Sequence, residues 1–362
     1  MRKIVCLATS PWYPIPTRKQ QVMSRIPDAE ILYFDPSVTY LAPLKDKAAR
    51  PGLSNYKKEG VHPQENITVY SLPPVLPFFY KFRWINKLNQ RRMARFVRRK
   101  MREHGFTDAV LWVYSPVTAD LVDLVPHKGL VYDCVDRHSA YGGLMDPTLV
   151  DRMELELAGK TDRTFATADA LAERLRAAQP NTVMIPNGAN FERFVQAAQP
   201  QPVPEDLRDI PHPIFGFVGA LQSCIEYDYL EAAAKARPDW SFVLIGKEKP
   251  GVDLTALHAM PNVHFLGLKP NEQLPQYLAH FDACLNLFAK SDLSKDVSPL
   301  KFYEYLATGR PIVSTRQPDQ ILQYAPLIEI ADSPEEFIAA CKASLADTAS
   351  ERTKARIEAG RA

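Results

Sequence analysis

The sequence predicts an α/β protein made of two doubly wound parallel-sheet halves. Short apolar runs alternate with helical patterns almost from end to end of the 362 residues, and alternating βα units build parallel sheets that are covered on both faces. A chain of this length is long for one hydrophobic core, so two domains are expected. The halves are separated by residues 196–213, a proline-rich stretch without apolar periodicity that we interpret as a linker.

Each predicted strand is a short apolar run, and each predicted helix has apolar residues at helical spacing. Strands are expected over 4–8, 31–34, 67–70, 109–113, 130–133, 164–166 and 183–185, and then over 214–218, 242–245, 263–266, 283–287, 312–314 and 327–330. Helices are expected over 84–103, 149–160, 169–178, 228–236, 273–280, 300–307 and 335–346. The predicted domains are a Rossmann-like domain at 1–195, the linker at 196–213, a second Rossmann-like domain at 214–345 and a helical tail at 346–362.

Composition excludes several classes of protein. With 46% apolar and 24% charged residues the chain is globular rather than disordered, and a net charge of +2 is too small to indicate a nucleic-acid partner. Five scattered cysteines without a CxxC pair indicate reduced thiols in a cytoplasmic protein. No segment approaches the ~18 apolar residues that span a membrane. No cluster has metal-ligand spacing, and the turn after the first strand lacks GxGxxG, which argues against a dehydrogenase.

Residues 296–314, DVSPLKFYEYLATGRPIVS, carry the strongest functional pattern. Ser298 is a natural helix N-cap, and Pro299 suits the first helical turn. The helix that they open, 300–307, is expected to stop at Gly309 before a strand. A helix N-terminus presents free N–H groups and partial positive charge, so this segment predicts an anion site.

Charged side chains surround that helix N-terminus. Lys301 and Glu304 are three residues apart and share one helix face, and Asp296 lies in the preceding loop. Backbone donors, a cation and two carboxylates within nine residues suit a ligand with a diphosphate and several hydroxyls. The alternative is that none of the three binds a ligand. Asp296 would then be a solvated capping acid, Glu304 an exposed carboxylate on the helix and Lys301 a surface lysine.

Together these features resemble the retaining glycosyltransferases of family 4, which have the two-domain GT-B fold. The segment from Asp296 to Glu304 resembles the family's paired-acid motif, two acids separated by seven residues, with Asp where the family usually has Glu. EYLATGRPIVST is similar to the family's helix-turn-strand, and VMIPNGANFERF (183–194) resembles its segment at the end of the N-terminal domain. Within the family the chain looks most like bacterial enzymes of teichuronic acid and exopolysaccharide assembly.

The resemblance implies an acceptor-side first domain and a second domain that holds a nucleoside diphosphate sugar, with no cofactor and no metal. Glu304 would accept hydrogen bonds from the ribose hydroxyls, and Asp296 would bind the sugar hydroxyls. The N–H groups near Leu300 and Lys301 would hold the diphosphate, and Ser298 and Gly219 are further donor-binding residues. The resemblance also implies a front-face mechanism, in which the departing phosphate oxygen takes the acceptor's proton and no enzyme nucleophile is needed.

The chain departs from the family pattern in the second half. The family's second domain opens with a turn that carries an arginine and, a few residues on, a lysine, both serving phosphates. The corresponding turn around Gly219, FVGALQSC, has neither cation. Lys301 is therefore the first candidate to meet the diphosphate charge, and Lys247 is the second.

A second departure lies in the first half. The family often has a histidine near the sugar, and the matching position in VYDCVDRHSAYGG is Val135. Asp136 and His138 are the nearest catalytic candidates, although an acid here could cap a turn and the histidine could be a polar loop residue. Arg18, in the loop after the first strand, is a further candidate for donor phosphate or acceptor.

The stretch 75–103 is the strongest local charge feature. It has an aromatic lead-in, apolar residues at helical spacing and ten basic residues against one acid. Such a helix suits an anionic membrane surface. The alternative is that the apolar stripe packs on the first sheet and the arginines are solvated. A nucleic-acid partner is not favoured, because no recognised binding motif accompanies the charge.

The sequence thus predicts a retaining, hexosyltransferase-type enzyme that moves a sugar from a nucleoside diphosphate donor to a glycan or lipid-linked acceptor of cell-surface polysaccharide synthesis. It would be cytoplasmic, or peripheral on the inner face of the membrane. Two alternatives stay open: a nucleotide-sugar 2-epimerase of the same fold, and a non-catalytic sugar-nucleotide-binding subunit of a polysaccharide assembly complex.

Overall fold

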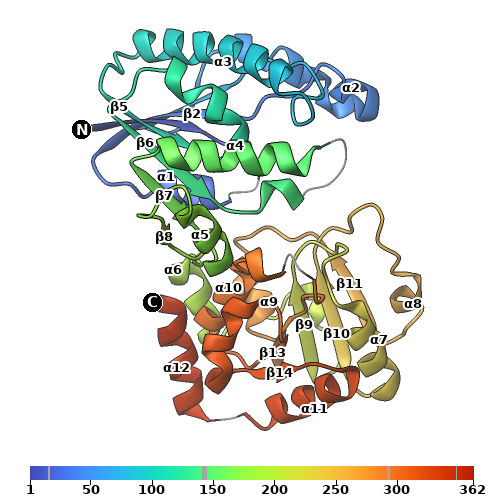
Figure 1. The fold of residues 1–362 in the computed structure, drawn as a ribbon. Coiled ribbons are helices and arrows are strands. Elements are labelled where there is room, and N and C mark those ends of the chain that lie inside the picture. Colours follow the sequence, from blue (N-terminus) through green and yellow to red (C-terminus); the bar gives the residue numbers. More distant parts are fainter. Residues whose placement is uncertain (15–16, 141–144, 292–293, 348) are drawn as a thin grey trace. The chain divides into compact units, whose positions relative to one another are not determined.

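The chain divides into two compact units, residues 1–185 and 186–362. A computed structural model describes residues 1–14, 17–140, 145–291, 294–347 and 349–362 (Figure 1). Each unit has one sheet with helices packed on both of its faces, as expected for alternating βα units.

The first unit contains an eight-stranded sheet with the order β3-β4-β2-β1-β5-β6-β7-β8. Its strands are β1 Arg2–Leu7, β2 Ala29–Asp35, β3 Val61–Gln64, β4 Ile67–Ser71, β5 Ala109–Val113, β6 Gly129–Cys134, β7 Arg163–Ala166 and β8 Val183–Met184. The sequence prediction missed β3, which pairs antiparallel with β4. Its residues VHPQ are mostly exposed and lack an apolar run, so no periodic signal marks this edge strand.

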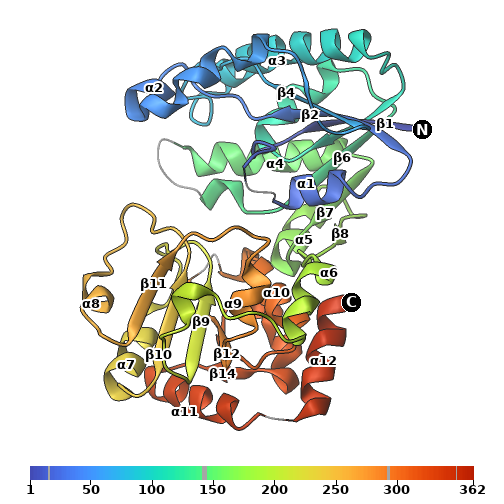
Figure 2. The same cartoon turned by 180° about the vertical axis from the view of Figure 1, so that it is seen from behind.

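Two cores cover the faces of the first sheet. The helices are α1 Arg18–Met23, α2 Ala42–Lys45, α3 Arg83–Glu103, α4 Pro147–Lys160 and α5 Asp169–Arg176. Apolar side chains of α3, α4 and α5 share one core, whereas Met23 of α1 belongs to the core on the other face. Figure 2 shows the molecule from the side of α1. The apolar stripe of α3 therefore packs on the sheet, as one of the two sequence interpretations proposed.

The second unit contains a six-stranded parallel sheet with the order β11-β10-β9-β12-β13-β14. Its strands are β9 Ile214–Val218, β10 Ser241–Ile245, β11 Val263–Gly267, β12 Ala283–Asn286, β13 Ile312–Thr315 and β14 Glu329–Ala331. Its helices are α6 Phe191–Phe194, α7 Tyr227–Ala236, α8 Thr255–His258, α9 Leu274–Leu278, α10 Leu300–Thr308, α11 Pro334–Leu345 and α12 Ser350–Arg361.

Strand order confirms the doubly wound prediction for both units. In each sheet the chain first builds outward in one direction and then returns to continue on the other side of the first strand. The order reverses between β1 and β5 in the first unit and between β9 and β12 in the second. Ligands of open α/β sheets bind beside the carboxyl ends of the strands at such a reversal, so these two edges are the places to look for a site.

The linker prediction over 196–213 is wrong. The units separate in the sequence between residues 185 and 186, and the proline-rich stretch belongs to the second unit. Ala197 and Leu207 are at most 3% exposed and lie in its core with residues of α9 and α10. These apolar anchors are too widely spaced among prolines and polar residues to produce a periodic pattern. The predicted tail is confirmed as helical by α12.

Candidate functional site

The carboxyl edge of the second sheet brings the backbones of two strand ends together. Gly219 follows β9, and its N–H donates to the carbonyl oxygen of Ile245 at 2.9 Å. Gly246 follows β10 with φ 157°, and a Cβ there would lie 1.7 Å from the Gly219 carbonyl oxygen. Only glycine fits at 246, and this part of the edge is therefore lined by backbone rather than by side chains.

Tyr305 joins α10 to the same edge. The Val218 N–H donates to the Tyr305 hydroxyl oxygen at 2.8 Å, and that hydroxyl lies 3.3 Å from the Val218 carbonyl oxygen. The ring is 1% exposed, and burial raises the pKa of Tyr305, so the hydroxyl stays protonated. Sequence reasoning missed this residue, because only tertiary packing reveals that its hydroxyl meets the end of β9.

The prediction of Ser298 as the N-cap of α10 is wrong by one residue. Pro299 occupies the N-cap position, and this residue makes no side-chain cap hydrogen bond. The Asn187 backbone N–H donates to Ser298 Oγ, and Asn187 Nδ2 donates to the Ser298 carbonyl oxygen, both at 2.9 Å. The serine hydroxyl thus accepts from residue 187. Because proline has no side-chain acceptor, the N-cap residue itself does not bind the first N–H groups of α10.

Lys301 and Glu304 form an ion pair on α10, with Nζ 2.7 Å from Oε2. The side chain of Glu304 is 6% exposed and that of Lys301 is 31% exposed. Burial raises the pKa of Glu304, and the Lys301 ammonium opposes that rise. Because an ammonium has three donors, Lys301 can bind Glu304 and still donate to a second anion. The pair therefore combines a buried acceptor with an accessible cation.

The remaining predicted residues of the second unit lie along the same chain segment or at the end of β10. Asp296 ends a short 3-10 helix just before α10 and is 6% exposed, and Leu300, the first residue of α10, is 36% exposed. Gly309 ends α10 in the left-handed conformation, as predicted. Lys247 is exposed beside a cavity of about 360 Å³ that Glu248, Phe265 and Leu268 also line.

The helix α12 supports α10 at its far end. Arg356 is fully buried, and its Nε donates to the Gly309 carbonyl oxygen at 2.9 Å. Its Nη1 donates to the Leu327 carbonyl oxygen at 3.1 Å and to Asp347 at 2.6 Å. One guanidinium thus ties the end of α10 to two other segments of the second unit.

In the first unit the structure ties Arg18 to Asp133 at the end of β6. The Nε–Oδ2 distance is 3.1 Å, and the side chains are 11% and 1% exposed. Lys19 is 8% exposed, and burial lowers its pKa against the opposing effect of Asp136 and Asp133. Arg18 therefore donates to a carboxylate of its own unit. Its predicted role toward a donor phosphate stays a prediction.

His138 is buried, with 4% exposure, and its Nε2 lies 3.0 Å from the Tyr114 carbonyl oxygen. A carbonyl only accepts, so Nε2 carries the proton of the neutral ring. Burial lowers the pKa of His138, which keeps the ring neutral at physiological pH. Asp136 is half-buried. Both residues follow β6, where the sequence placed them, and their catalytic roles stay predictions.

Across the described parts of the chain, no group of three or more His, Cys, Asp or Glu side chains is arranged to hold a metal ion.

Comparison with known proteins gives a family match within the second unit. Residues 212–347 match the family described as glycosyl transferases group 1. A Bacillus subtilis (strain 168) protein, "Putative teichuronic acid biosynthesis glycosyltransferase TuaH", is 26% identical over 260 residues, which cover 67% of this chain and 65% of that protein. The match therefore spans slightly less than two thirds of the relative's length.

Solved structures resemble the whole chain. The sucrose-phosphate synthase of Thermosynechococcus elongatus superimposes with a TM-score of 0.71 at 14% identity, covering 99% of this chain and 94% of that one. An E. coli structure described as "Trehalose-6-phosphate from E. coli bound with UDP-2-fluoro glucose" gives 0.70 at 12%, covering 99% and 95%. Anabaena Alr3699/HepE in complex with UDP and glucose gives 0.62 at 14%, covering 100% and 94%. The chain therefore has the GT-B fold, and its residues 212–347 match the family model of the glycosyl transferases group 1.

Proposed function

We propose that this chain is a retaining glycosyltransferase that transfers a sugar from a nucleoside diphosphate donor to a glycan or lipid-linked acceptor of cell-surface polysaccharide synthesis. The observation that carries the proposal is the start of α10. There a helix N-terminus with a proline at its N-cap, a buried carboxylate and an accessible ammonium lie beside the strand reversal of the unit that matches the group 1 family. The teichuronic acid relative supports the class of acceptor.

The donor would be bound by four kinds of group in the second unit. The N–H groups at Leu300 and Lys301 would hold the diphosphate, because a helix N-terminus favours anions. The ammonium of Lys301 would neutralise it, with Lys247 as a second cation. Glu304 would accept from the ribose hydroxyls and Asp296 from the sugar hydroxyls. The UDP and sugar ligands of two structural neighbours make a uridine diphosphate sugar the first donor to test.

The chain's own residues would act by positioning and by charge stabilisation. As the sugar–phosphate bond breaks, negative charge grows on the leaving diphosphate, where the α10 N–H groups and Lys301 can stabilise it. The leaving phosphate oxygen would take the acceptor's proton, so the reaction requires neither an enzyme nucleophile nor a metal. Asp136 and His138 are the first-unit candidates for contacts with the sugar.

Donor binding by Glu304→Gln tests the site. Titration calorimetry with UDP, GDP and ADP, alone and as sugars, identifies the donor, and the variant should bind it about 10- to 100-fold more weakly, since a hydrogen bond to a charged group contributes about 1.5–3 kcal/mol. Glu231→Gln is the matched control, because Glu231 forms a similar ion pair with Lys235 on the surface of α7. Unchanged donor binding by Glu304→Gln would refute the assignment.

Product analysis tests the reaction. Incubation with the donor and a lipid-linked or oligosaccharide acceptor should yield a glycoside whose anomeric configuration, read by NMR, matches that of the donor. Inversion would refute the retaining mechanism. Conversion of the donor's sugar without any acceptor would support the 2-epimerase, and tight donor binding without any turnover would support the non-catalytic subunit.

A further inference from the structure

The outer face of α3 carries a row of basic side chains, Lys87, Arg91, Arg95, Arg98 and Arg102, which we call the basic stripe. All five are exposed. They are spaced by four, four, three and four residues, and because a helix has 3.6 residues per turn they lie within one narrow face. The opposite face of α3, with Met93, Phe96 and Val97 among others, is buried in the core.

The stripe differs from the other cations of α3 in having no polar partner among the residues that the structure describes. Arg83 pairs with Asp120 and Glu156, Arg99 and Lys100 pair with Glu103, and Arg92 donates to the Tyr40 hydroxyl. For the side chains of the basic stripe, the described residues supply neither an ion pair nor a hydrogen bond. Five like charges on one helix face repel one another, which favours an external anionic partner.

Exposed apolar side chains lie at the N-terminal end of the stripe. Trp84 is 67% exposed and Leu88 is 49% exposed, and each lies three residues before a member of the stripe, on the same face. Phe78 and Phe82, just before the helix, are each 42% exposed. We call these four residues the apolar end. The apolar end is exposed and is separate from the apolar stripe of α3, which is buried against the sheet.

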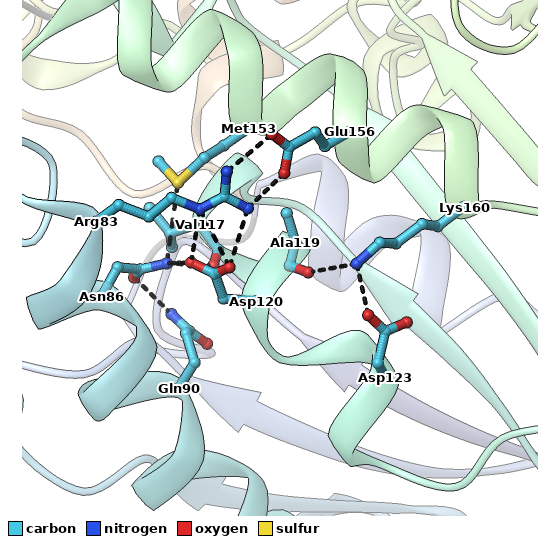
Figure 3. Close-up of polar contacts among 10 residues, drawn as sticks. All are labelled: Arg83, Asn86, Gln90, Val117, Ala119, Asp120, Asp123, Met153, Glu156 and Lys160. Carbon is cyan, nitrogen blue, oxygen red and sulfur yellow. Dashed lines mark hydrogen bonds and ion pairs between the residues drawn. The ribbon is translucent and has the colours of Figure 1, made fainter.

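Polar contacts on the inner side of α3 fix the direction in which the stripe points. Figure 3 shows Arg83 between the carboxylates of Asp120 and Glu156, with its Nη2 3.0 Å from Asp120 Oδ1. Asn86 Nδ2 donates to the Val117 carbonyl oxygen and to Asp120 Oδ2, both at 2.9 Å. These bonds attach α3 to its neighbours in the first unit, so the outer face is presented without needing to reorganise.

We propose that the basic stripe and the apolar end bind the surface of an anionic phospholipid membrane, with α3 lying along it. Arginine and lysine would meet the lipid phosphates, and Trp84, Leu88 and the two phenylalanines would enter the headgroup boundary. Exposed aliphatic and aromatic side chains beside the cations favour a lipid surface over a polyanion, which offers charge but no apolar layer. No described helix has the length and apolar character to cross a bilayer. The inference does not depend on the proposed function.

Vesicle co-sedimentation of the full chain without any substrate tests the inference. Vesicles with about 30% phosphatidylglycerol in phosphatidylcholine should bind the chain at least tenfold more tightly than pure phosphatidylcholine, and about 0.5 M salt should remove most of that preference. Equal binding to both vesicles would overturn the proposal. Tighter binding to single-stranded RNA than to anionic vesicles at the same salt would overturn it as well.

A pair of matched triple variants locates the surface. Arg91→Gln/Arg95→Gln/Arg98→Gln should weaken binding to anionic vesicles roughly 100-fold, at about fivefold for each basic residue. The control, Lys128→Gln/Arg163→Gln/Arg176→Gln, removes three exposed charges of the same unit outside α3 and should change binding only a few-fold. Equal losses in both variants would show that net charge alone is responsible and would overturn the proposal. Unchanged thermal unfolding checks that both variants are folded.

The apolar end has its own test. Trp84→Ala should weaken binding on the order of tenfold, and the loss should persist at high salt, because burial of an apolar side chain is not screened. A loss that disappears with salt, or no loss at all, would show that the apolar end does not enter the bilayer.

Discussion

The two units place charged side chains at the carboxyl ends of their sheets in different ways. In the first unit Arg18 and Asp133 are both nearly inaccessible, at 11% and 1% exposure. In the second unit Glu304 is buried at 6%, but its partner Lys301 is 31% exposed and lies at a helix N-terminus whose N-cap residue is a proline. The pairs are chemically alike, a cation and a carboxylate within hydrogen-bond distance. They differ in whether a ligand can reach the cation.

This difference teaches how to separate structural from functional ion pairs. In a pair that is closed on both sides, removing one partner leaves the other charge buried and uncompensated, which is strongly destabilising. In a pair with one accessible member, that member can also form hydrogen bonds with a ligand. We therefore expect the pair of the first unit to contribute to stability and the pair of the second unit to contribute to donor binding.

Arg18→Ala should have the largest effect. It leaves Asp133 buried without its guanidinium, which should lower the free energy of unfolding of the first unit by about 3–5 kcal/mol. Chemical denaturation followed by hydrogen exchange of peptides from α1 and β6 measures the loss, and peptides of the second unit serve as the internal reference. Arg18→Lys retains the charge and should recover part of the stability. A loss below about 1 kcal/mol would show that this pair behaves as a solvent-exposed ion pair.

Lys301→Ala should have a small effect on stability and a large effect on donor binding. The free energy of unfolding should fall by at most about 1 kcal/mol, because the pair is partly exposed and Glu304 can take up a proton. Donor affinity measured by calorimetry should fall about 10- to 100-fold, the effect of one charged hydrogen bond to phosphate. Lys235→Ala, which breaks the surface pair of α7, is the control. A large loss of stability with unchanged donor affinity would reverse the comparison.

Asp35→Asn should have the smallest effect, and it should depend on pH. Asp35 accepts from the Trp12 N–H at 2.8 Å, and burial raises its pKa to about 6. The folded state thus binds the proton more tightly than the unfolded chain, so wild-type stability decreases as pH rises from about 4 through 6. Asparagine mimics the protonated form.

The variant should therefore be more stable than the wild type by about 1–2 kcal/mol at pH 8, less than the full pKa shift would give because Asp35 is only half-buried. At pH 4 the two proteins should unfold at the same denaturant concentration. Equal differences at both pH values would show that the carboxyl group is solvated.

Sequence patterns predicted the sheets well because most of their strands are buried and therefore continuous in apolar character. The pattern failed where burial is local or absent. The exposed edge strand β3 has no apolar run, and Ala197 and Leu207 are single buried residues within the proline-rich stretch 196–213. Both failures arise because periodicity reports a face with many buried residues and not an isolated contact.

The site shows the same limit. The acids, the lysine and the helix of residues 296–309 could be predicted, since they lie within one segment and follow local rules for helix ends. The bonds that hold this segment could not. The Asn187 N–H donates to the Ser298 hydroxyl, which was predicted to cap the helix, and the Tyr305 hydroxyl accepts from the Val218 N–H at the end of β9. Both contacts join residues about 90 to 110 positions apart, for which one sequence contains no spacing rule.

The buried guanidinium of Arg356 has a consequence for the order in which the molecule matures. The first unit is complete in sequence at residue 185, so it can fold while the second is being synthesised. The end of α10 obtains its Arg356 contact only when α12 has been made. At roughly 5–20 residues per second, about 10–35 s separate the two events. During that interval the nascent chain can already present the basic stripe of α3, while the helix proposed to hold the donor still lacks its last support.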